Sequence, residues 1–352
     1  MIRVLIVEDS PVVGDFLRHL LSTDPKIQVI GTASNGEVAL DAVQRQQPDV
    51  ITMDIHMPRM NGWEATRKIM ETHPTPIVIV SSSVMADEVT TTFRAIEAGA
   101  LAVVPRPQGL THPEYEATAQ ELIQTVKLMS EVKVVRRWPR SQHGSRIPAT
   151  LKADMPRAST AIQVVAIGAS TGGPPVLQTL LSGLPKDFSV SVLIVQHLAS
   201  GFVHKFAEWL TQSTGFPVHV AAAGDDLLPG HAYLGPDGVH LQVGMDRRIV
   251  LSQDAAKNGL RPSISCLFQS VAQVFGCYAA GVLLTGMGKD GAEELKLLRD
   301  KGAITIVQDK DSAVVYGMPG EAVKLDAATY MLSPDKMAPA LIRLVSKKGI
   351  KR

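Results

Sequence analysis

The sequence is poor in cysteine, in aromatic residues and in net charge. Cys266 and Cys277 are the only cysteines among 352 residues, which argues against a fold held together by disulfides. The formal net charge is +1, whereas proteins that bind nucleic acid usually carry a strong basic excess. We therefore expect neither a disulfide framework nor a nucleic-acid partner.

Long apolar runs are also missing. A transmembrane helix needs about 20 consecutive apolar residues, and the longest candidate here, Ala279–Thr285, has only the length of a strand. The N-terminus reaches Glu8 and Asp9 without the apolar core and cleavage site of a signal peptide. The sequence thus predicts a cytoplasmic protein with no direct membrane insertion.

The first third of the chain contains a regular alternation of strand-like and helix-like segments. Short apolar runs occur at Val4–Val7, Val29–Gly31, Val50–Met53, Ile77–Val80 and Leu101–Val104. The segments between them have helical periodicity, and a last helix is expected over 113–131. This alternation predicts an α/β domain over residues 1–127, with a five-stranded parallel sheet covered on both faces.

The amino-acid composition changes after this domain. Arginine, proline, serine and glutamine follow without a period, which predicts a flexible linker over 128–159. A second α/β domain is expected over 160–350, doubly wound and mostly parallel. Its strands are predicted at Ile162–Ile167, Val190–Val195, Ala280–Leu284 and Ala303–Val307. Pro-Gly and Asp-Gly breaks between Pro217 and Ser252 predict inserted β-hairpins.

Polar residues follow the predicted strands of the first domain. They are Glu8, Asp9, Asp54, Ser81 and Arg106. Parallel strands bring such residues to one edge of a sheet, where converging carboxylates repel each other unless a cation such as Mg²⁺ lies among them. A carboxylate there can act as a nucleophile toward a phosphoryl donor. Singly, Asp54 could also be a turn aspartate and Ser81 part of a polar loop.

Residues 1–127 resemble the receiver domain of two-component response regulators, a flavodoxin-like fold, through the motifs at 7–10, 53–58, 60–62 and 98–100. The resemblance implies that Asp54 is phosphorylated. It implies Glu8, Asp9 and Asp54 as Mg²⁺ ligands, with the backbone carbonyl of His56. Ser81 and Arg106 would sense the phosphoryl group. Arg106 stands where the family has lysine, and its planar fork is not an equivalent cation, so its coupling of phosphorylation to output is open.

A glycine-rich turn follows the first strand of the second domain. Residues 168–172 fit the Gly-x-Ser-x-Gly pattern of a nucleophile elbow with Ser170 at its centre. An anion or dinucleotide loop is the other interpretation, but the spacing is not G-x-G-x-x-G. His197 closes the next predicted strand and Asp290 follows a later one, so a nucleophile, a base and an orienting carboxylate would all lie at strand ends.

The second domain resembles the catalytic domain of chemotaxis protein-glutamate methylesterases, the CheB family, over 164–337. The motifs are those at 167–173, 196–197, 228–233, 261–263, 284–291 and 316–319. The resemblance implies Ser170 as nucleophile, His197 as general base and acid, and Asp290 as its orienter. It places Thr171 and Met287 at the oxyanion hole. The family often has an acidic residue where this chain has Ser265.

The same resemblance implies the reaction and the partners. The substrate would be a glutamate γ-methyl ester on the cytoplasmic helices of a chemoreceptor, with receptor glutamine deamidated as a second activity. A chemotaxis histidine kinase would donate the phosphoryl group, and hydrolysis would need no cofactor. Two other classes stay open. A catalytically silent interaction regulator conflicts with the complete triad, and a DNA-binding regulator lacks a helix-turn-helix after the linker.

Overall fold

The computed structural model describes residues 1–81, 86–109, 112, 115–132, 134 and 161–345. Two compact units, Met1–Met155 and Pro156–Arg352, divide the chain. The predicted linker lies for the most part outside the described residues. No helix in the described ranges combines the length and the apolar character needed to cross a membrane.

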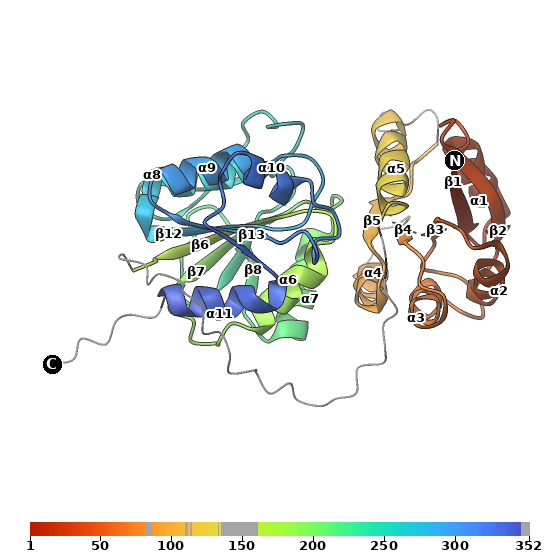
Figure 1. Cartoon of the computed structure of the whole chain (residues 1–352), viewed down its shortest axis with the longest axis horizontal. Helices are drawn as coiled ribbons and strands as arrows, with labels where there is room; N and C mark the ends of the chain where they lie inside the picture. The colour runs from red at the N-terminus through yellow and green to blue at the C-terminus, as the bar shows by residue number, and fades with distance from the viewer. Residues whose placement is uncertain (82–85, 110–111, 113–114, 133, 135–160, 346–352) are drawn as a thin grey trace. The chain divides into compact units, whose positions relative to one another are not determined.

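The first unit alternates strands and helices as predicted. In chain order its elements are β1 (Ile2–Val7), α1 (Pro11–Leu21), β2 (Ile27–Ala33), α2 (Gly36–Gln46), β3 (Val50–Met53), α3 (Gly62–Thr72), β4 (Ile77–Ser81), α4 (Ala86–Ala98), β5 (Ala102–Pro105) and α5 (Tyr115–Met129). The five strands form one parallel sheet in the order β2-β1-β3-β4-β5. Helices α2, α3 and α4 cover one face, and α1 and α5 cover the other (Figure 1).

Local chemistry explains where two of these helices begin. The Asn35 side chain accepts hydrogen bonds from the backbone N–H groups of Glu37 and Val38, which caps α2. Asn61 caps α3 by accepting from Glu64 N–H. The next residue, Gly62, leaves no room for a side chain, because a Cβ there would lie 2.0 Å from the Asp54 carbonyl oxygen. Helix α3 therefore starts directly beside Asp54.

The second unit is built on a larger sheet. Its elements are β6 (Val164–Ala169), α6 (Gly173–Ser182), β7 (Ser191–Gln196), α7 (Val203–Thr214), β8 (Val218–Val220), β9 (Ala232–Leu234), β10 (His240–Val243), β11 (Ile249–Ser252), α8 (Ile264–Val274), a 3₁₀ turn (Gly276–Tyr278), β12 (Ala279–Leu283), α9 (Ala292–Asp300), β13 (Ile304–Gln308), α10 (Met318–Lys324), β14 (Tyr330–Leu332) and α11 (Pro334–Val345). Seven strands are parallel, in the order β14-β13-β12-β6-β7-β9-β8.

The prediction of inserted hairpins holds for one pair of strands. β10 and β11 form an antiparallel hairpin outside the main sheet. Two other short strands in the same region, β8 and β9, instead extend the main sheet in parallel register. Each of these two strands has only three residues, which is too few for an alternation of apolar and polar residues that would predict the pairing direction.

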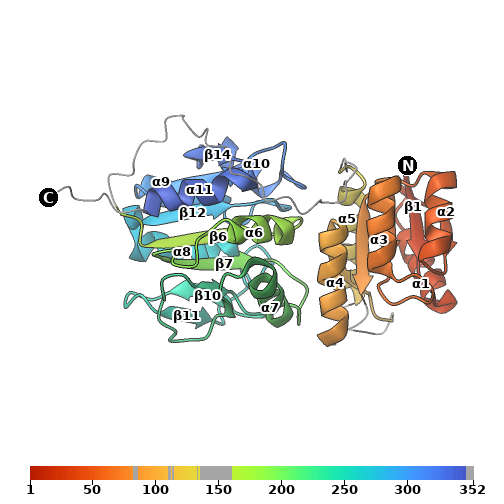
Figure 2. The same cartoon turned by 90° about the horizontal axis from the view of Figure 1, so that it is seen from below.

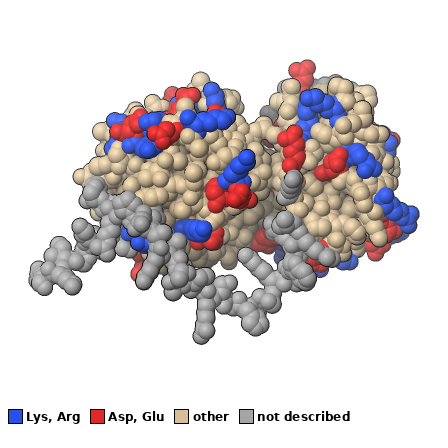
Figure 3. Space-filling view, in the orientation of Figure 1, with Lys and Arg blue, Asp and Glu red and all other residues tan. Residues whose placement is uncertain are grey.

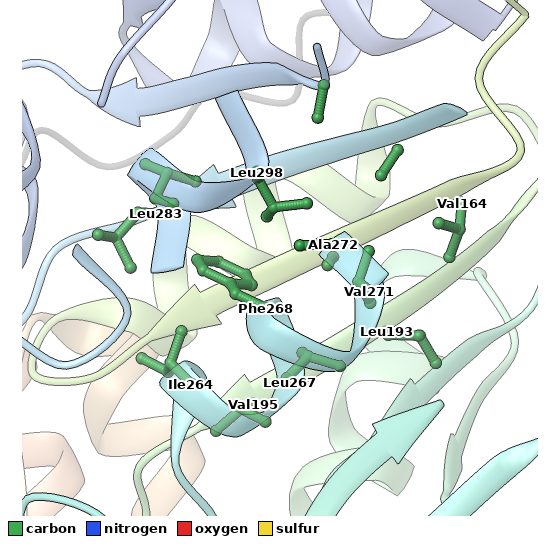
Figure 4. Close-up of a cluster of buried hydrophobic side chains, with 14 of the residues drawn as sticks. Val164, Leu193, Val195, Ile264, Leu267, Phe268, Val271, Ala272, Leu283 and Leu298 are labelled. Atoms are coloured by element: carbon green, nitrogen blue, oxygen red, sulfur yellow. The ribbon is translucent and has the colours of Figure 1, made fainter. Parts of the chain in front are cut away.

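Helices cover both faces of the seven-stranded sheet. Figures 1 and 2 show α8, α9 and α10 on one face and α6, α7 and α11 on the other. Beneath α8, the side chains of Leu267, Phe268 and Val271 lie against strand residues such as Val164 and Val195, all buried (Figure 4). Burying one such side chain contributes about 2 kcal/mol. This packing fixes the N-terminus of α8 at the edge of the sheet where the strands end.

Charges on the face of the second unit seen in Figure 3 are mixed. Basic and acidic side chains lie beside each other over α9 and α10, where Lys296 pairs with Asp300, Lys324 with Glu321 and Arg299 with Asp326. On the face shown, the described residues gather into no extended basic surface.

Candidate functional sites

Both sheets reverse their strand order at one point, and the candidate sites lie there. In the second unit the order reverses at β6, which pairs with β7 on one side and β12 on the other. In the first unit it reverses at β1, between β2 and β3. A crevice opens at the carboxyl end of the strands at such a point.

The structure places the predicted nucleophile and base side by side at the carboxyl ends of β6 and β7. β6 and β7 pair up to Ala169 and Gln196, so Ser170 and His197 follow as the next neighbours. The ladder continues between them, since His197 N–H donates to the Ala169 carbonyl at 3.0 Å. Ser170 N–H donates to the carbonyl of Thr285, beyond β12, at 3.0 Å. The backbone around Ser170 is therefore held from both neighbouring strands.

Asp290 reaches the same point from the loop after β12. Its Oδ2 accepts a hydrogen bond from His197 Nε2 at 3.1 Å. When Nε2 carries the proton, the neutral ring keeps its lone pair on Nδ1. Nδ1 is then the ring nitrogen that can accept a proton. His197 is 13% exposed and Asp290 is 2% exposed, so the pair is largely shielded from water.

The N-terminus of α8 surrounds Asp290 with further donors. Ser263, the N-cap residue of α8, donates from Oγ to Asp290 Oδ1 at 2.8 Å. Ile264 N–H donates to Oδ2 at 2.7 Å and Ser265 N–H to Oδ1 at 3.3 Å. Burial by itself raises the pKa of Asp290, but the hydrogen bond and charge of His197, followed by the bonds from Ser263 and Ser265, overcome it and lower the pKa to about 2. Asp290 therefore stays a carboxylate across the physiological pH range.

One peptide beside Ser170 has a fixed orientation. The Gly286 carbonyl accepts hydrogen bonds from Gly317 N–H at 3.2 Å and Met318 N–H at 3.0 Å. Carbonyl and N–H groups of a trans peptide point in opposite directions, so Met287 N–H faces away from Gly317. A Cβ on Gly286 would lie 2.6 Å from Ser170 Cβ, which shows how closely this backbone approaches the serine. Such an N–H can stabilise an oxyanion.

Sequence reasoning assigned no role to several polar side chains that support this site. Gln196 donates from Nε2 to the carbonyls of Ser170 and His197, at 2.9 Å each. Buried Thr285 donates from Oγ1 to the Thr171 carbonyl at 2.9 Å, which ties the two predicted oxyanion loops together. Only their positions in the sequence could have indicated such a role, because Gln196 ends a strand and Ser263 precedes an apolar helix.

In the first unit, three carboxylates gather at the carboxyl ends of β1 and β3. Ligand oxygens of Glu8, Asp9 and Asp54 all lie within 4.8 Å of one another. Burial, followed by the charge of Asp54, raises the pKa of Glu8 to about 7. Burial also raises the pKa of Asp54, although the Ile55 N–H bond and the charge of Arg106 oppose the rise. The charge of Arg106 therefore does not balance the negative charge of the three carboxylates. Carboxylate oxygens are the ligands that Mg²⁺ prefers.

The other predicted residues of this site come from β4 and β5. Ser81 is buried at the end of β4, and its carbonyl accepts from Arg106 N–H at 2.7 Å. Arg106 Nη1 lies 3.8 Å from Glu8 Oε2, while Arg106 Nε is buried and has no hydrogen-bond partner among the described residues. The guanidinium is therefore oriented toward the carboxylates, and its Nε–H group is available as a hydrogen-bond donor. The predicted role of the His56 carbonyl remains a prediction.

Comparison with known proteins gives a consistent result for both units. The CheB methylesterase family model matches residues 165–341, and the response regulator receiver domain model matches residues 4–112. A protein-glutamate methylesterase/protein-glutamine glutaminase of Geobacter metallireducens is 56% identical, covering 99% of this chain and 100% of that protein. One of Nitrosospira multiformis is also 56% identical, covering 99% of this chain and 98% of that protein.

A solved structure matches the second unit. The crystal structure of the Thermotoga maritima CheB methylesterase catalytic domain has a TM-score of 0.51 and 32% sequence identity to this chain. It covers 53% of this chain and 100% of its own.

Proposed function

Because the chain belongs to the CheB family of protein-glutamate methylesterases/protein-glutamine glutaminases, we propose that Ser170 is the nucleophile of its hydrolytic reaction. The enzyme couples a receiver domain to this hydrolase and acts in chemotactic adaptation. The observation that carries the proposal is the hydrogen bond between His197 Nε2 and a fully engaged Asp290. This hydrogen bond leaves Nδ1 of His197 as the base for Ser170, which follows the neighbouring strand.

The first half of the reaction forms an acyl-enzyme. Ser170 Oγ attacks the γ-carbonyl carbon of a glutamate methyl ester on a chemoreceptor while His197 Nδ1 takes the hydroxyl proton. Asp290 stabilises the imidazolium that results. The N–H groups of Thr171 and Met287 hold the developing oxyanion, and one such donor contributes about 3 kcal/mol in comparable enzymes. His197 then protonates the leaving methoxide, and methanol departs.

The second half regenerates the enzyme. Water attacks the acyl carbon while His197 again takes a proton. His197 returns this proton to Ser170 Oγ as the acyl bond breaks, and the receptor leaves with a free glutamate. With a glutamine substrate the leaving group is ammonia and the product is the same. Since the receptor segments concerned are cytoplasmic, we assign the reaction to the cytoplasm.

Phosphorylation of the receiver controls this activity in our proposal. Asp54 is the acceptor, and a chemotaxis histidine kinase is the donor. Glu8, Asp9, Asp54 and the His56 carbonyl would hold Mg²⁺, whose charge offsets the carboxylates and the incoming phosphoryl oxygens. Ser81 and Arg106 bind the phosphoryl oxygens once Asp54 is modified.

Methanol release from methylated receptor membranes tests the proposal. Wild type and Ser170→Ala are compared, each with and without Mg²⁺ and acetyl phosphate. We expect release that requires Ser170 and increases on phosphorylation. Release that requires Ser170 but ignores phosphorylation would retain the esterase and reject control through Arg106. Equal release by Ser170→Ala would refute the proposed nucleophile.

A further inference from the structure

Position 265, where the resemblance leads one to expect an acidic residue, lies directly beside the catalytic aspartate. Ser265 is the second residue of α8, and it is 1% exposed. Its N–H donates to Asp290 Oδ1 at 3.3 Å, and its Oγ accepts from Gly291 N–H at 3.0 Å. One residue therefore touches both the carboxylate and the peptide that follows it.

The hydroxyl of Ser265 has a third partner on a different helix. Glu294, in the first turn of α9, accepts a hydrogen bond from Ser265 Oγ at 2.5 Å. A hydroxyl has one proton, so donation to Glu294 leaves its lone pairs for Gly291 N–H. The carboxylate thus determines which way the hydroxyl points. Without it, the Ser265 proton could turn toward other acceptors and release Gly291.

The charge of Glu294 is balanced in place. Lys257 Nζ, from the loop between β11 and α8, lies 2.6 Å from Glu294 Oε1. The Glu294 side chain is 13% exposed and Lys257 is 36% exposed, so the pair is only partly hydrated. An ionised Glu294 is the stronger acceptor for the Ser265 hydroxyl.

We propose that Glu294 is a positioning residue of the catalytic centre, acting through Ser265 on the Asp290–Gly291 peptide. Helix α9 thus supplies a carboxylate to the hydrogen-bond network that the N-terminus of α8 forms around Asp290. This inference rests on the proposed function, because Asp290 matters only if it orients His197. Gly291 has φ of +82°, a conformation that glycine adopts readily but that needs external contacts to fix it.

A set of full-length variants tests this assignment. Glu294→Gln and Ser265→Ala each remove one member of the relay, and Ser265→Asp combined with Glu294→Ala moves the carboxylate to α8. Glu293→Gln is the matched control, since Glu293 is an exposed acid in the same helical turn. The measurements are kcat and KM for methanol release from methylated receptor membranes with Mg²⁺ and acetyl phosphate, together with the thermal midpoint.

We expect Glu294→Gln and Ser265→Ala to lower kcat about tenfold, because small displacements of reacting groups cost at least that much. KM should stay within about twofold, since Glu294 lies outside the groups that touch substrate. The swapped double variant should recover most of kcat, and Glu293→Gln should match wild type. A contact that only stabilises the fold would not lower kcat while leaving KM unchanged, and moving the carboxylate to α8 would not restore kcat.

Three results would overturn the inference. The first is an unchanged kcat in Glu294→Gln. The second is a kcat that falls in step with the thermal midpoint in every variant and is not restored in the Ser265→Asp/Glu294→Ala double variant. The third is an equal fall of kcat in Glu293→Gln. Ser170→Ala in the same assay separates the two proposals. If it is inactive while Glu294→Gln is normal, only the positioning role fails. If it stays active, the proposed nucleophile fails as well.

Discussion

Each unit of this chain buries a carboxylate where a parallel sheet reverses its strand order, but the two carboxylates have opposite surroundings. Asp290 accepts hydrogen bonds from His197, Ser263, Ile264 and Ser265, and its pKa falls to about 2. Asp54 accepts one backbone bond, from Ile55, beside two further acids, and its pKa is raised. Similar topology has thus produced one carboxylate that accepts hydrogen bonds from four residues and one that accepts a backbone bond from Ile55 alone among the described residues.

This difference separates their chemistry. A carboxylate whose lone pairs are all engaged is a poor nucleophile and a good support for an imidazolium. One surrounded by like charges gains from a cation and stays free to attack a phosphoryl donor. The opposite pKa shifts also predict opposite effects of pH on stability, and these provide ways to test the comparison.

The largest expected effect is the loss of catalysis in Asp290→Asn. An amide cannot stabilise the imidazolium and favours the wrong tautomer of His197, so kcat for methanol release should fall about 10⁴-fold. Phosphate incorporation into Asp54 from acetyl phosphate should be unchanged, since that site lies in the other unit. A fall of less than tenfold in kcat would contradict the assigned role of Asp290.

A smaller effect is expected from Ser263→Ala. Losing a hydrogen bond to a charged group should lower the free energy of unfolding of the second unit by about 2 kcal/mol at neutral pH. Asp290 has a depressed folded pKa, so its stabilisation is present above about pH 4 and is lost as pH falls toward 2. Urea unfolding at pH 7 and pH 3 should therefore show a difference between wild type and variant that shrinks in acid. A constant difference would indicate a packing effect instead.

The receiver should show the opposite pH dependence. Glu8 has a raised folded pKa, so its contribution to stability is full below about pH 4.5 and is lost as pH rises through about 7. Mg²⁺ must displace that proton, so its affinity should fall about tenfold between pH 8 and pH 6. Titration calorimetry of the full chain with MgCl₂ would measure this, with Asp54→Asn as the control for site occupancy. Affinity independent of pH would exclude Glu8 as the coupled group.

The smallest effect concerns Arg106. Its charge lowers the pKa of Glu8 and of Asp54, so Arg106→Gln should move the pH dependence of Mg²⁺ affinity upward by roughly half a pH unit. Arg106→Lys keeps the charge and should not move it. A shift in Arg106→Lys equal to that in Arg106→Gln would mean that guanidinium geometry, and not charge, sets the electrostatics of the cluster.

Much of the fold was predictable because its signals are local. Apolar runs between polar turns predicted the receiver strands to within two residues at each end. The short strands β8 and β9 were not predicted to join the main sheet, because three residues carry no register. The linker boundaries remain a prediction.

The sequence by itself determined which chemical groups stand at the strand ends: Ser170, His197, Asp290 and the acids around Asp54. It could do so because strand ends are marked by short-range hydrophobic patterns, and parallel strands share one carboxyl edge. Only the tertiary structure decided which partners each carboxylate has. Ser263, Ser265 and Glu294 meet Asp290 and its loop because α8 and α9 pack side by side on the sheet, and that packing follows from the burial of the whole core rather than from any local motif.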